Sequence, residues 1–352
     1  MNPTLPKEMQ KLAAAQIEKE TEILDLPNVV GVALGTKQVK DEDTEKPCVT
    51  AFVSAKLDPA FLSKDQMVPS NVNEFPTDVV ETGFIFAGDI VPEADVSLEY
   101  AERPARAEAP PPVHMEAPGA LAATSTTLTR RVRPAMGGYS CGHYKITAGT
   151  IATCCYDLSP FPSVPGKYYI LSNNHVLANS NAASLGDPIL QPGPFDGGHL
   201  PADVIARLTR YVPIQFHTPT TKPLNLVDAA IAEGNFHDLN REVYWGGHVK
   251  ALYTAPKVND IVQKTGRTTG FTTGRVTNIN ATVDVNYGGG RIARFRNQIV
   301  TTRMGAPGDS GSLIMNRDEH AVGLLFAGSS TRTIINNILF VQLLLRVRLH
   351  EQ

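Results

Sequence analysis

A serine set among glycines is the most distinctive chemical feature of this sequence. In the stretch Gly305–Ser312 it appears as Gly308-Asp309-Ser310-Gly311. A serine hydroxyl becomes a nucleophile only when a base takes its proton, and backbone amides on such a tight turn can converge on an oxyanion. A glycine-rich hairpin with a surface serine is the simpler alternative. The pattern makes Ser310 a candidate nucleophile.

A histidine at the end of an apolar run can supply the base. The run Tyr169–Leu171 leads into the polar turn Ser172–Asn174, and His175 follows directly. Of the nine histidines, this one is best placed to face a cleft. A hydrogen-bonded histidine at a strand end, with no catalytic role, is the alternative.

A buried carboxylate must hold such a histidine in the correct tautomer. Asp228 stands inside the otherwise apolar run Leu226–Ala232. Burying a lone carboxylate costs free energy, so a partner is expected, and His175 is the candidate. Asp203 competes for this role, but it lies nearer the start of its strand, beside Pro201.

The chain order His175, Asp228, Ser310, with Gly-Asp-Ser-Gly around the serine, resembles the chymotrypsin/trypsin-like serine proteases, in particular the bacterial type. The similarity covers residues 137 to 350 and includes the run Lys264–Gly274, which is similar to the entry of the second barrel in bacterial members. Without the resemblance this run suggests a phosphate loop, but the Gly-Lys-Ser/Thr ending is absent. The resemblance implies a double β-barrel.

The resemblance also implies roles for individual residues. It makes Ser310 the nucleophile, His175 the base and Asp228 the orienting acid. The backbone amides of Gly308 and Ser310 would form the oxyanion hole. Substrate would contact the base of the specificity pocket at Met304 and pair as an added strand along Phe326, Ala327 and Gly328.

The sequence departs from the family pattern in two ways. Val176 follows His175, where animal members have a cysteine that closes a disulfide. No Ile-Val-Gly-Gly activation start is present, so Asp309 lacks the new amino terminus that normally partners it. Either cleavage elsewhere or another group must take that role.

The elements that position these residues are mostly short strands. Runs at His143–Ala152, Tyr168–Ser172, Val204–Thr209 and Gly274–Ile279 alternate with Gly, Pro and Asn turns, which indicates antiparallel barrels or a sandwich. An apolar stretch from Ile334 to Leu349 predicts a C-terminal helix. We therefore expect a mainly β protease domain over 133–352.

Residues 1–100 differ from a protease barrel. Helical spacing over 5–24, strand-like runs at Val29–Leu34 and Val49–Val53, and an apolar stretch at Val79–Ile90 predict a small α+β leader domain. Its sequence resembles leader domains found ahead of bacterial trypsin-like domains. An inhibitory, chaperoning or partner-docking role remains open. A Pro/Ala-rich linker is expected over 101–132, with Arg130-Arg131 as a possible processing site.

Composition limits the partners and the compartment. A formal net charge of −3 and no large basic block argue against nucleic acid. The N-terminus lacks the apolar core of a secretory signal, and no stretch is long and apolar enough for a membrane span, so we expect a cytoplasmic protein. The cysteines at 48, 141, 154 and 155 are expected to be free thiols.

No cofactor and no metal are expected. A zinc site built from Cys141, His143, Cys154 and Cys155 is conceivable, but adjacent cysteines suit a tetrahedral site poorly. The sequence thus predicts a serine endopeptidase that acts on proteins or peptides, regulated by its N-terminal region, by processing or by a protein partner. A catalytically silent protease-fold scaffold is the alternative.

Overall fold

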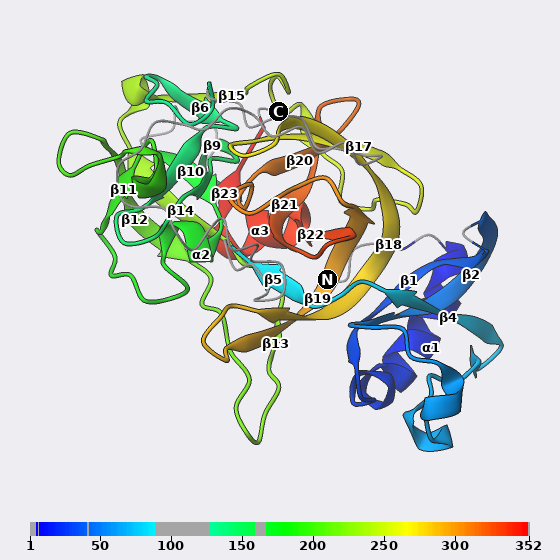
Figure 1. Cartoon of the computed structure of the whole chain (residues 1–352). Helices are drawn as coiled ribbons and strands as arrows, with labels where there is room; N and C mark the ends of the chain where they lie inside the picture. Colours follow the sequence, from blue (N-terminus) through cyan, green and yellow to red (C-terminus); the bar gives the residue numbers. More distant parts are fainter. Residues whose placement is uncertain (1–4, 6, 41, 89–126, 159–166, 351–352) are drawn as a thin grey trace, which may run out of the picture.

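The computed structural model describes residue 5 and residues 7–40, 42–88, 127–158 and 167–350. Strands dominate this part of the chain and form two large sheets and one two-stranded sheet (Figure 1). The smallest sheet pairs β6 (Ala135–Gly137) with β15 (Leu239–Val243). The mainly β, double-barrel fold with a C-terminal helix and a small α+β region ahead of it, predicted from sequence, is confirmed.

An eight-stranded sheet, called the first barrel here, carries the histidine and the aspartate of the predicted triad. Its order is β23-β9-β10-β14-β12-β11-β7-β8. The bounds are β7 (Ser140–His143), β8 (Gly149–Thr150), β9 (Thr153–Asp157), β10 (Tyr168–Ser172), β11 (Pro188–Leu190), β12 (Val204–Tyr211), β14 (Ala230–Gly234) and β23 (Val347–Arg348). The 3-10 turn Pro194–Asp196 connects β11 to β12, and the 3-10 turn Phe236–Asp238 leads from β14 to β15 of the two-stranded sheet.

A second barrel follows and carries the candidate nucleophile. Six strands close a ring, because β18 pairs with both β17 and β19. They are β17 (Ile261–Gly266), β18 (Gly270–Asn286), β19 (Ile292–Thr302), β20 (Leu313–Asn316), β21 (His320–Gly328) and β22 (Arg332–Asn337). The short strands β13 (Leu224–Asn225) and β16 (Ala251–Leu252) pair with β19 and β21.

The leader region contains one long helix on a small sheet. Its elements are α1 (Lys7–Leu24), β1 (Val29–Val39), β2 (Glu42–Val53), β3 (Asn71–Val72) and β4 (Phe75–Glu81), with 3-10 turns at Pro59–Phe61 and Lys64–Gln66. The helix buries Leu12, Ile23 and Leu24 against the sheet. Apolar residues at helical spacing therefore give the helix that the sequence predicts, beginning at Lys7.

The leader sheet continues directly into the second barrel. In Figure 1 the long curved strand β18 runs from the barrel to β1, and the register pairs Gly31 with Val283. A side chain at Gly31 would bring its Cβ to 2.8 Å from Val283 Cγ1, so this close approach requires glycine. One core cluster holds Leu12 and Val32 of the leader together with Val276 of β18. The leader thus shares both a sheet and a core with the second barrel.

The C-terminal apolar stretch differs in detail from the single helix predicted over Ile334–Leu349. Residues up to Asn337 belong to β22, the helix α3 spans Ile338–Leu345, and β23 follows. Asn337 stops the strand because its side chain caps the helix, accepting a hydrogen bond from the amide of Leu339 at 2.9 Å. Among the described residues no helix is long and apolar enough to cross a membrane.

Most of the predicted linker, residues 101–126, lies outside the described residues. From residue 127 the chain is held on the first barrel: Leu128 is buried, and its carbonyl accepts a hydrogen bond from Ser140. The carbonyl of Arg130 accepts a hydrogen bond of 2.9 Å from Gln191. The Arg130-Arg131 pair therefore exposes its side chains while its backbone is fixed, which differs from the end of a free linker.

Candidate active site

The turn after β10 places His175 at the edge of the first barrel. The short helix α2 (Asn174–Leu177) begins two residues after the strand ends, and Asn173 precedes it in extended backbone. The Asn173 side-chain amide donates to the carbonyl of Asp228 at 2.7 Å. This bond ties the histidine turn to the segment that carries the aspartate.

His175 and Asp228 form a closely bonded pair. The distance from His175 Nδ1 to Asp228 Oδ2 is 2.6 Å, and the backbone amide of His175 donates to Asp228 Oδ1 at 3.1 Å. Asp228 is fully buried. An imidazole that donates a hydrogen bond from Nδ1–H to a carboxylate carries its lone pair on Nε2, which can then accept a proton. Among the described residues, His175 Nε2 has no hydrogen-bond partner.

The competing carboxylate Asp203 makes different contacts. Its side chain accepts a hydrogen bond from the amide of His199 at 2.9 Å and pairs with Arg131 at 3.1 Å. Asp203 therefore caps a turn on the first barrel, and the structure brings Asp228, rather than Asp203, to His175.

Ser310 lies on a turn that only glycine-rich sequence can form. Gly308 and Gly311 have φ of 91° and 96°, in the left-handed region that favours glycine. A side chain at Gly311 would collide with Ser172 Oγ and the carbonyl of Thr150. Among the described residues, the backbone amides of Gly308 and Ser310 have no acceptor within the chain. Neither amide is used within the described part of the chain, and their role as oxyanion donors stays a prediction.

A short strand from the first barrel joins the serine turn to the histidine turn. The amide of Thr150 donates to the carbonyl of Ser310 at 2.8 Å, and the carbonyl of Thr150 accepts from Ser172 Oγ at 2.7 Å. At Gly149, an added Cβ would lie 3.0 Å from the carbonyl oxygen of Ser310 and closer still to the side chain of Val176. These contacts place the two turns on opposite sides of one junction between the barrels.

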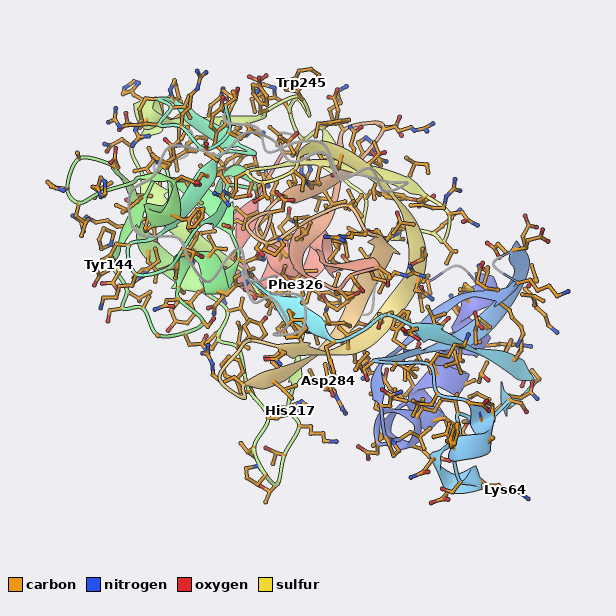
Figure 2. All side chains as sticks on the ribbon, viewed as in Figure 1. Lys64, Tyr144, His217, Trp245, Asp284 and Phe326 are labelled. Carbon is orange, nitrogen blue, oxygen red and sulfur yellow. The ribbon has the colours of Figure 1, made fainter. Side chains whose placement is uncertain are left out.

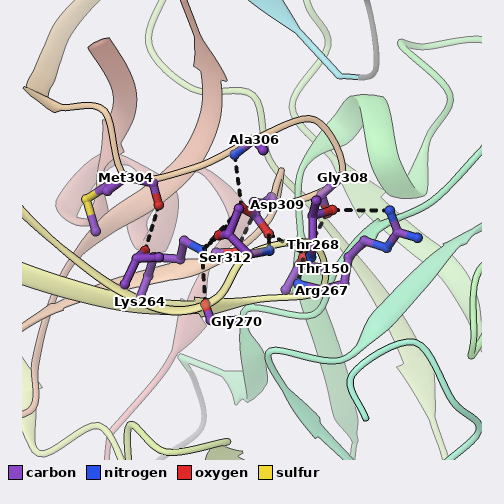
Figure 3. Close-up of polar contacts among 12 residues, drawn as sticks. Thr150, Lys264, Arg267, Thr268, Gly270, Met304, Ala306, Gly308, Asp309 and Ser312 are labelled. Carbon is purple, nitrogen blue, oxygen red and sulfur yellow. Dashed lines mark hydrogen bonds and ion pairs between the residues drawn. The ribbon is translucent and has the colours of Figure 1, made fainter. Parts of the chain in front are cut away.

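Asp309, which precedes Ser310 in the chain, accepts hydrogen bonds from several surrounding donors (Figure 3). Its Oδ1 accepts from the amides of Thr268 and Thr269 at 2.9 and 3.2 Å. Its Oδ2 accepts from Thr269 Oγ1 at 2.6 Å and from the amide of Ala306 at 3.0 Å. A fully buried carboxylate with four such donors fixes the loop on which Ser310 lies.

A buried lysine supplies the positive charge for Asp309. Lys264 Nζ lies 3.2 Å from Asp309 Oδ2, and both side chains are completely buried. The same ammonium donates to the carbonyl of Gly270 at 3.1 Å. Burial lowers the pKa of Lys264, and the charge of Asp309 opposes that shift. Lys264 therefore stands where the missing activation terminus was expected to act, so this contact requires no cleavage of the chain.

Lys264 is a residue that the sequence prediction missed. It lies in the run Lys264–Gly274, which the sequence singles out only as the entry to the second barrel. The signal that could have found it is a lone lysine inside the strand β17, since a buried charge requires a partner.

A cavity of about 590 Å³ opens beside Ser310. Its lining includes Arg303, Gly305, Pro307, Ser310, Gly328 and Thr333. Met304 is predicted to form the base of the pocket, and this prediction is wrong in detail. The Met304 side chain is fully buried in the core of the second barrel, and it is the neighbours Arg303 and Gly305 that line the cavity.

The predicted substrate strand lies at the end of β21. Phe326, labelled near the middle of the view in Figure 2, is fully buried, while Ala327 and Gly328 line the cavity. On one side, β22 pairs with Ala327 and Gly328. On the other side, the short strand β5 (Ile85–Ala87) pairs with the same two residues.

Tyr287 contacts Asp228 of the predicted triad, and the sequence prediction missed this contact as well. Its hydroxyl donates to Asp228 Oδ2 at 2.7 Å, and its ring lies edge-on to the ring of His175 with centroids 6.2 Å apart. Burial raises the pKa of Tyr287 well above its usual value, and the charge of Asp228 adds to the shift. Tyr287 lies just after β18 and is far from Asp228 in the sequence, so no local pattern indicates this contact.

The four cysteines are buried and unpaired. Burial raises the pKa of Cys48 to about 11 and that of Cys154 to about 12. In the conceivable zinc set, His143 Nε2 lies 3.1 Å from Asp187 Oδ2. Within the described ranges, no group of three His, Cys, Asp or Glu residues is placed to hold a metal ion.

Residues 17–81 match the family model of the NARROW LEAF 1 N-terminal domain. This match spans most of the leader region and includes no strand of either barrel. The matched residues include the second half of α1 and most of the leader sheet.

The chain is similar to a curated bacterial serine protease over part of its length. Serine protease 2 of Streptomyces fradiae is 47% identical over 73 residues, which are 21% of this chain and 33% of that protein. The chain thus spans about a third of the length of this curated relative. The predicted resemblance to bacterial trypsin-like serine proteases is confirmed.

Similar solved structures include Thermobifida fusca protease A and the Nocardiopsis protease. The first is 16% identical with a TM-score of 0.43, and covers 62% of this chain and 98% of its own. The second is 18% identical with a TM-score of 0.41, and covers 61% of this chain and 98% of its own.

Proposed function

We propose that this protein is a serine endopeptidase whose triad is Ser310, His175 and Asp228. The observation that carries the proposal is the bonded His175–Asp228 pair, whose free Nε2 lies across the barrel junction from a serine turn with two unused amides. A base, an orienting acid and oxyanion donors are the parts that acyl transfer requires.

In the first half of the reaction, Ser310 Oγ attacks the carbonyl carbon of a peptide bond. His175 Nε2 takes the hydroxyl proton, and Asp228 stabilises the imidazolium that forms. The amides of Gly308 and Ser310 donate to the oxyanion of the tetrahedral intermediate. The imidazolium then gives its proton to the leaving amine, the C–N bond breaks, and an acyl-enzyme remains.

In the second half, water attacks the acyl-enzyme and His175 takes its proton. The intermediate collapses, and the proton returns to Ser310 Oγ as the carboxylic acid product leaves. Lys264 and Asp309 touch none of the reacting atoms. Their ion pair acts earlier, because it holds the serine turn in the conformation that exposes both amides.

Hydrolysis of a mixed peptide library, followed by mass spectrometry, tests the proposal. The wild-type chain should cut internal peptide bonds, and Ser310→Ala should lower turnover by roughly 10⁴-fold or more. Full peptidase activity in Ser310→Ala would contradict the proposal. The silent-scaffold alternative predicts no cleavage by either protein, together with tight binding of peptides.

We also propose that the N-terminal region regulates this activity, and that a cut or a protein partner releases it. The shared sheet between β1 and β18 supports regulation through contact, since it fixes the leader beside the second barrel. The Arg130-Arg131 cut and a cytoplasmic location remain part of the proposal. Activity before and after trypsin nicking of the full chain tests the first part, and unchanged rates would contradict it.

A further inference from the structure

We propose that Ile85–Gly88 is an internal ligand of the active-site cleft that competes with peptide substrates. The proposal rests on the proposed function and names the element that regulates it. The occupant is the chain's own strand β5, and the surface is the edge of β21 beside the cavity at Ser310. The competing ligand is an extended peptide.

Strand β5 fills a gap between two strands of the second barrel. It runs parallel to the end of β18, with Ile85 opposite Val285, and antiparallel to β21, with Ala87 opposite Ala327. Because β22 already pairs with the other edge of β21, both edges of Ala327 and Gly328 are occupied. An incoming peptide can add a strand here only when β5 leaves.

The end of β5 reaches the base of the triad. Gly88 follows the strand with φ of 73°, and a Cβ added to it would lie 3.5 Å from His175 Cδ2 and 3.9 Å from Nε2. Gly88 also lines the cavity that contains Ser310. A side chain at residue 88 would therefore lie in van der Waals contact with the imidazole, where a substrate would pass.

The burial of β5 shows what kind of peptide fits this edge. Ile85 and Ala87 are each only 2% exposed and share a core cluster with Phe326, while Phe86 lines the cavity. Gly88 puts no side chain into the 590 Å³ cavity. A substrate residue in the place of Gly88 would fill that space, so extended apolar peptides with a larger residue there can displace β5.

The variant Ala87→Glu tests this proposal in the full chain. A carboxylate at this buried position opposes docking of β5 but touches no triad residue. If the open state is about 0.1–10% populated, kcat/KM for an extended peptide should rise about tenfold to a thousandfold. The control Phe61→Ala changes an exposed leader residue, 84% exposed, and should leave kcat/KM unchanged.

Two further measurements separate this proposal from the proposed function. In a Ser310→Ala background, the amides of Ala327 and Gly328 should lose hydrogen-exchange protection when Ala87→Glu is added. A synthetic Gly-Phe-Ile-Phe-Ala-Gly peptide should inhibit the Ala87→Glu enzyme competitively, and a scrambled peptide should not. Unchanged protection and unchanged kcat/KM in Ala87→Glu would overturn the proposal. Absence of Ser310-dependent cleavage in every variant would instead overturn the proposed function.

A different observation carries a second inference: the structure assigns Tyr287 as a positioning residue of the triad. Its hydroxyl and His175 Nδ1 both donate to Asp228 Oδ2, at 2.7 and 2.6 Å. The tyrosine ring is itself held, since it packs on Phe216 and Phe295. Tyr287 thus fixes the orientation of the carboxylate that orients the histidine.

Tyr287→Phe removes the hydroxyl and keeps the ring. A hydrogen bond to a charged group is lost, so kcat should fall roughly tenfold to a hundredfold with KM unchanged. The matched control is Tyr253→Phe, whose hydroxyl donates to Asp260 at 2.8 Å away from the triad, and it should keep wild-type kcat. An unchanged kcat in Tyr287→Phe, or an equal loss in the control, would overturn the inference.

Discussion

Two buried carboxylates, Asp228 and Asp309, flank the serine turn and differ in what surrounds them. Asp228 bonds to a histidine and a tyrosine, and no lysine or arginine pairs with it among the described residues. Asp309 bonds to Lys264 and to donors of the surrounding loops. Both are fully buried, so burial alone does not distinguish them.

The two aspartates differ in whether the partner side chain has a nitrogen left to exchange a proton with another group. The partner of Asp228 is an imidazole whose second ring nitrogen, Nε2, is buried and has no hydrogen-bond partner among the described residues. The partner of Asp309 is an ammonium whose donors are used within the chain. The catalytic pair thus leaves one ring nitrogen without a hydrogen-bond partner, which can accept a proton from the reacting group. The structural pair has its polar groups hydrogen-bonded within the chain, which holds the loop in place.

The largest expected effect is that of replacing Asp228, the carboxylate bonded to His175. Asp228→Asn keeps the volume but can no longer select the correct histidine tautomer, so kcat should fall on the order of 10⁴-fold while the fold persists. Circular dichroism checks the fold, and a peptide assay gives kcat. The control is Asp203→Asn, which alters the other candidate acid. Equal losses in both variants would show that Asp228 has no special role.

The next largest effect is expected from removing the cation that pairs with Asp309. Lys264→Met leaves the Asp309 carboxylate buried without its cation, which should lower the free energy of unfolding by about 3–5 kcal/mol. Urea denaturation measures the change. Lys250→Met removes a cation from the exposed pair with Glu319 and should cost at most about 1 kcal/mol. Similar values for the two variants would contradict the structural role of Lys264.

Much of this arrangement could be predicted from the sequence, because local patterns carry it. The glycines at 308 and 311 indicate a turn with positive φ, and the polar residues before His175 indicate the end of a strand. The carboxylate of Asp228 stands out in an apolar run. Each of these signals is read from a few consecutive residues.

The remaining contacts join residues far apart in the sequence. Lys264 meets Asp309 and Tyr287 meets Asp228 only through the closure of the second barrel, which no local periodicity encodes. The predicted pocket residue Met304 fails for a related reason. Alternation along a chain segment decides which of Arg303, Met304 and Gly305 faces the cavity, and a single-residue offset reverses the outcome.

The smallest expected effect is the change in stability with pH that the buried cysteine thiols cause. These thiols are weak acids without a cationic partner. Burial raises the pKa of Cys48 to about 11 from a usual 9.0, so above pH 9 the unfolded chain ionises first and binds fewer protons. Stability should therefore fall as the pH rises, by roughly 1 kcal/mol per thiol near pH 10. Urea denaturation at pH 8 and 10, on wild type and Cys48→Ala, measures it.

The same thiols test the predicted compartment. Titration in denaturant should count about four free thiols, and the native protein should react slowly because all four are buried. A smaller slope with pH in Cys48→Ala would support the thiol origin of the alkaline loss. Two disulfides in the freshly purified protein would contradict both the free thiols and a reducing compartment.

Labelling of the full-length chain with a fluorophosphonate tests the central claim most directly. The reagent bonds covalently to a serine that a neighbouring base activates, and peptide mapping identifies which serine it modifies. We predict modification of Ser310 alone, with labelling lost in His175→Ala and retained in Lys250→Met. The proposed β5 occupant predicts faster labelling in Ala87→Glu. Labelling at another serine, or an unlabelled Ser310 in both wild type and Ala87→Glu, would contradict the account.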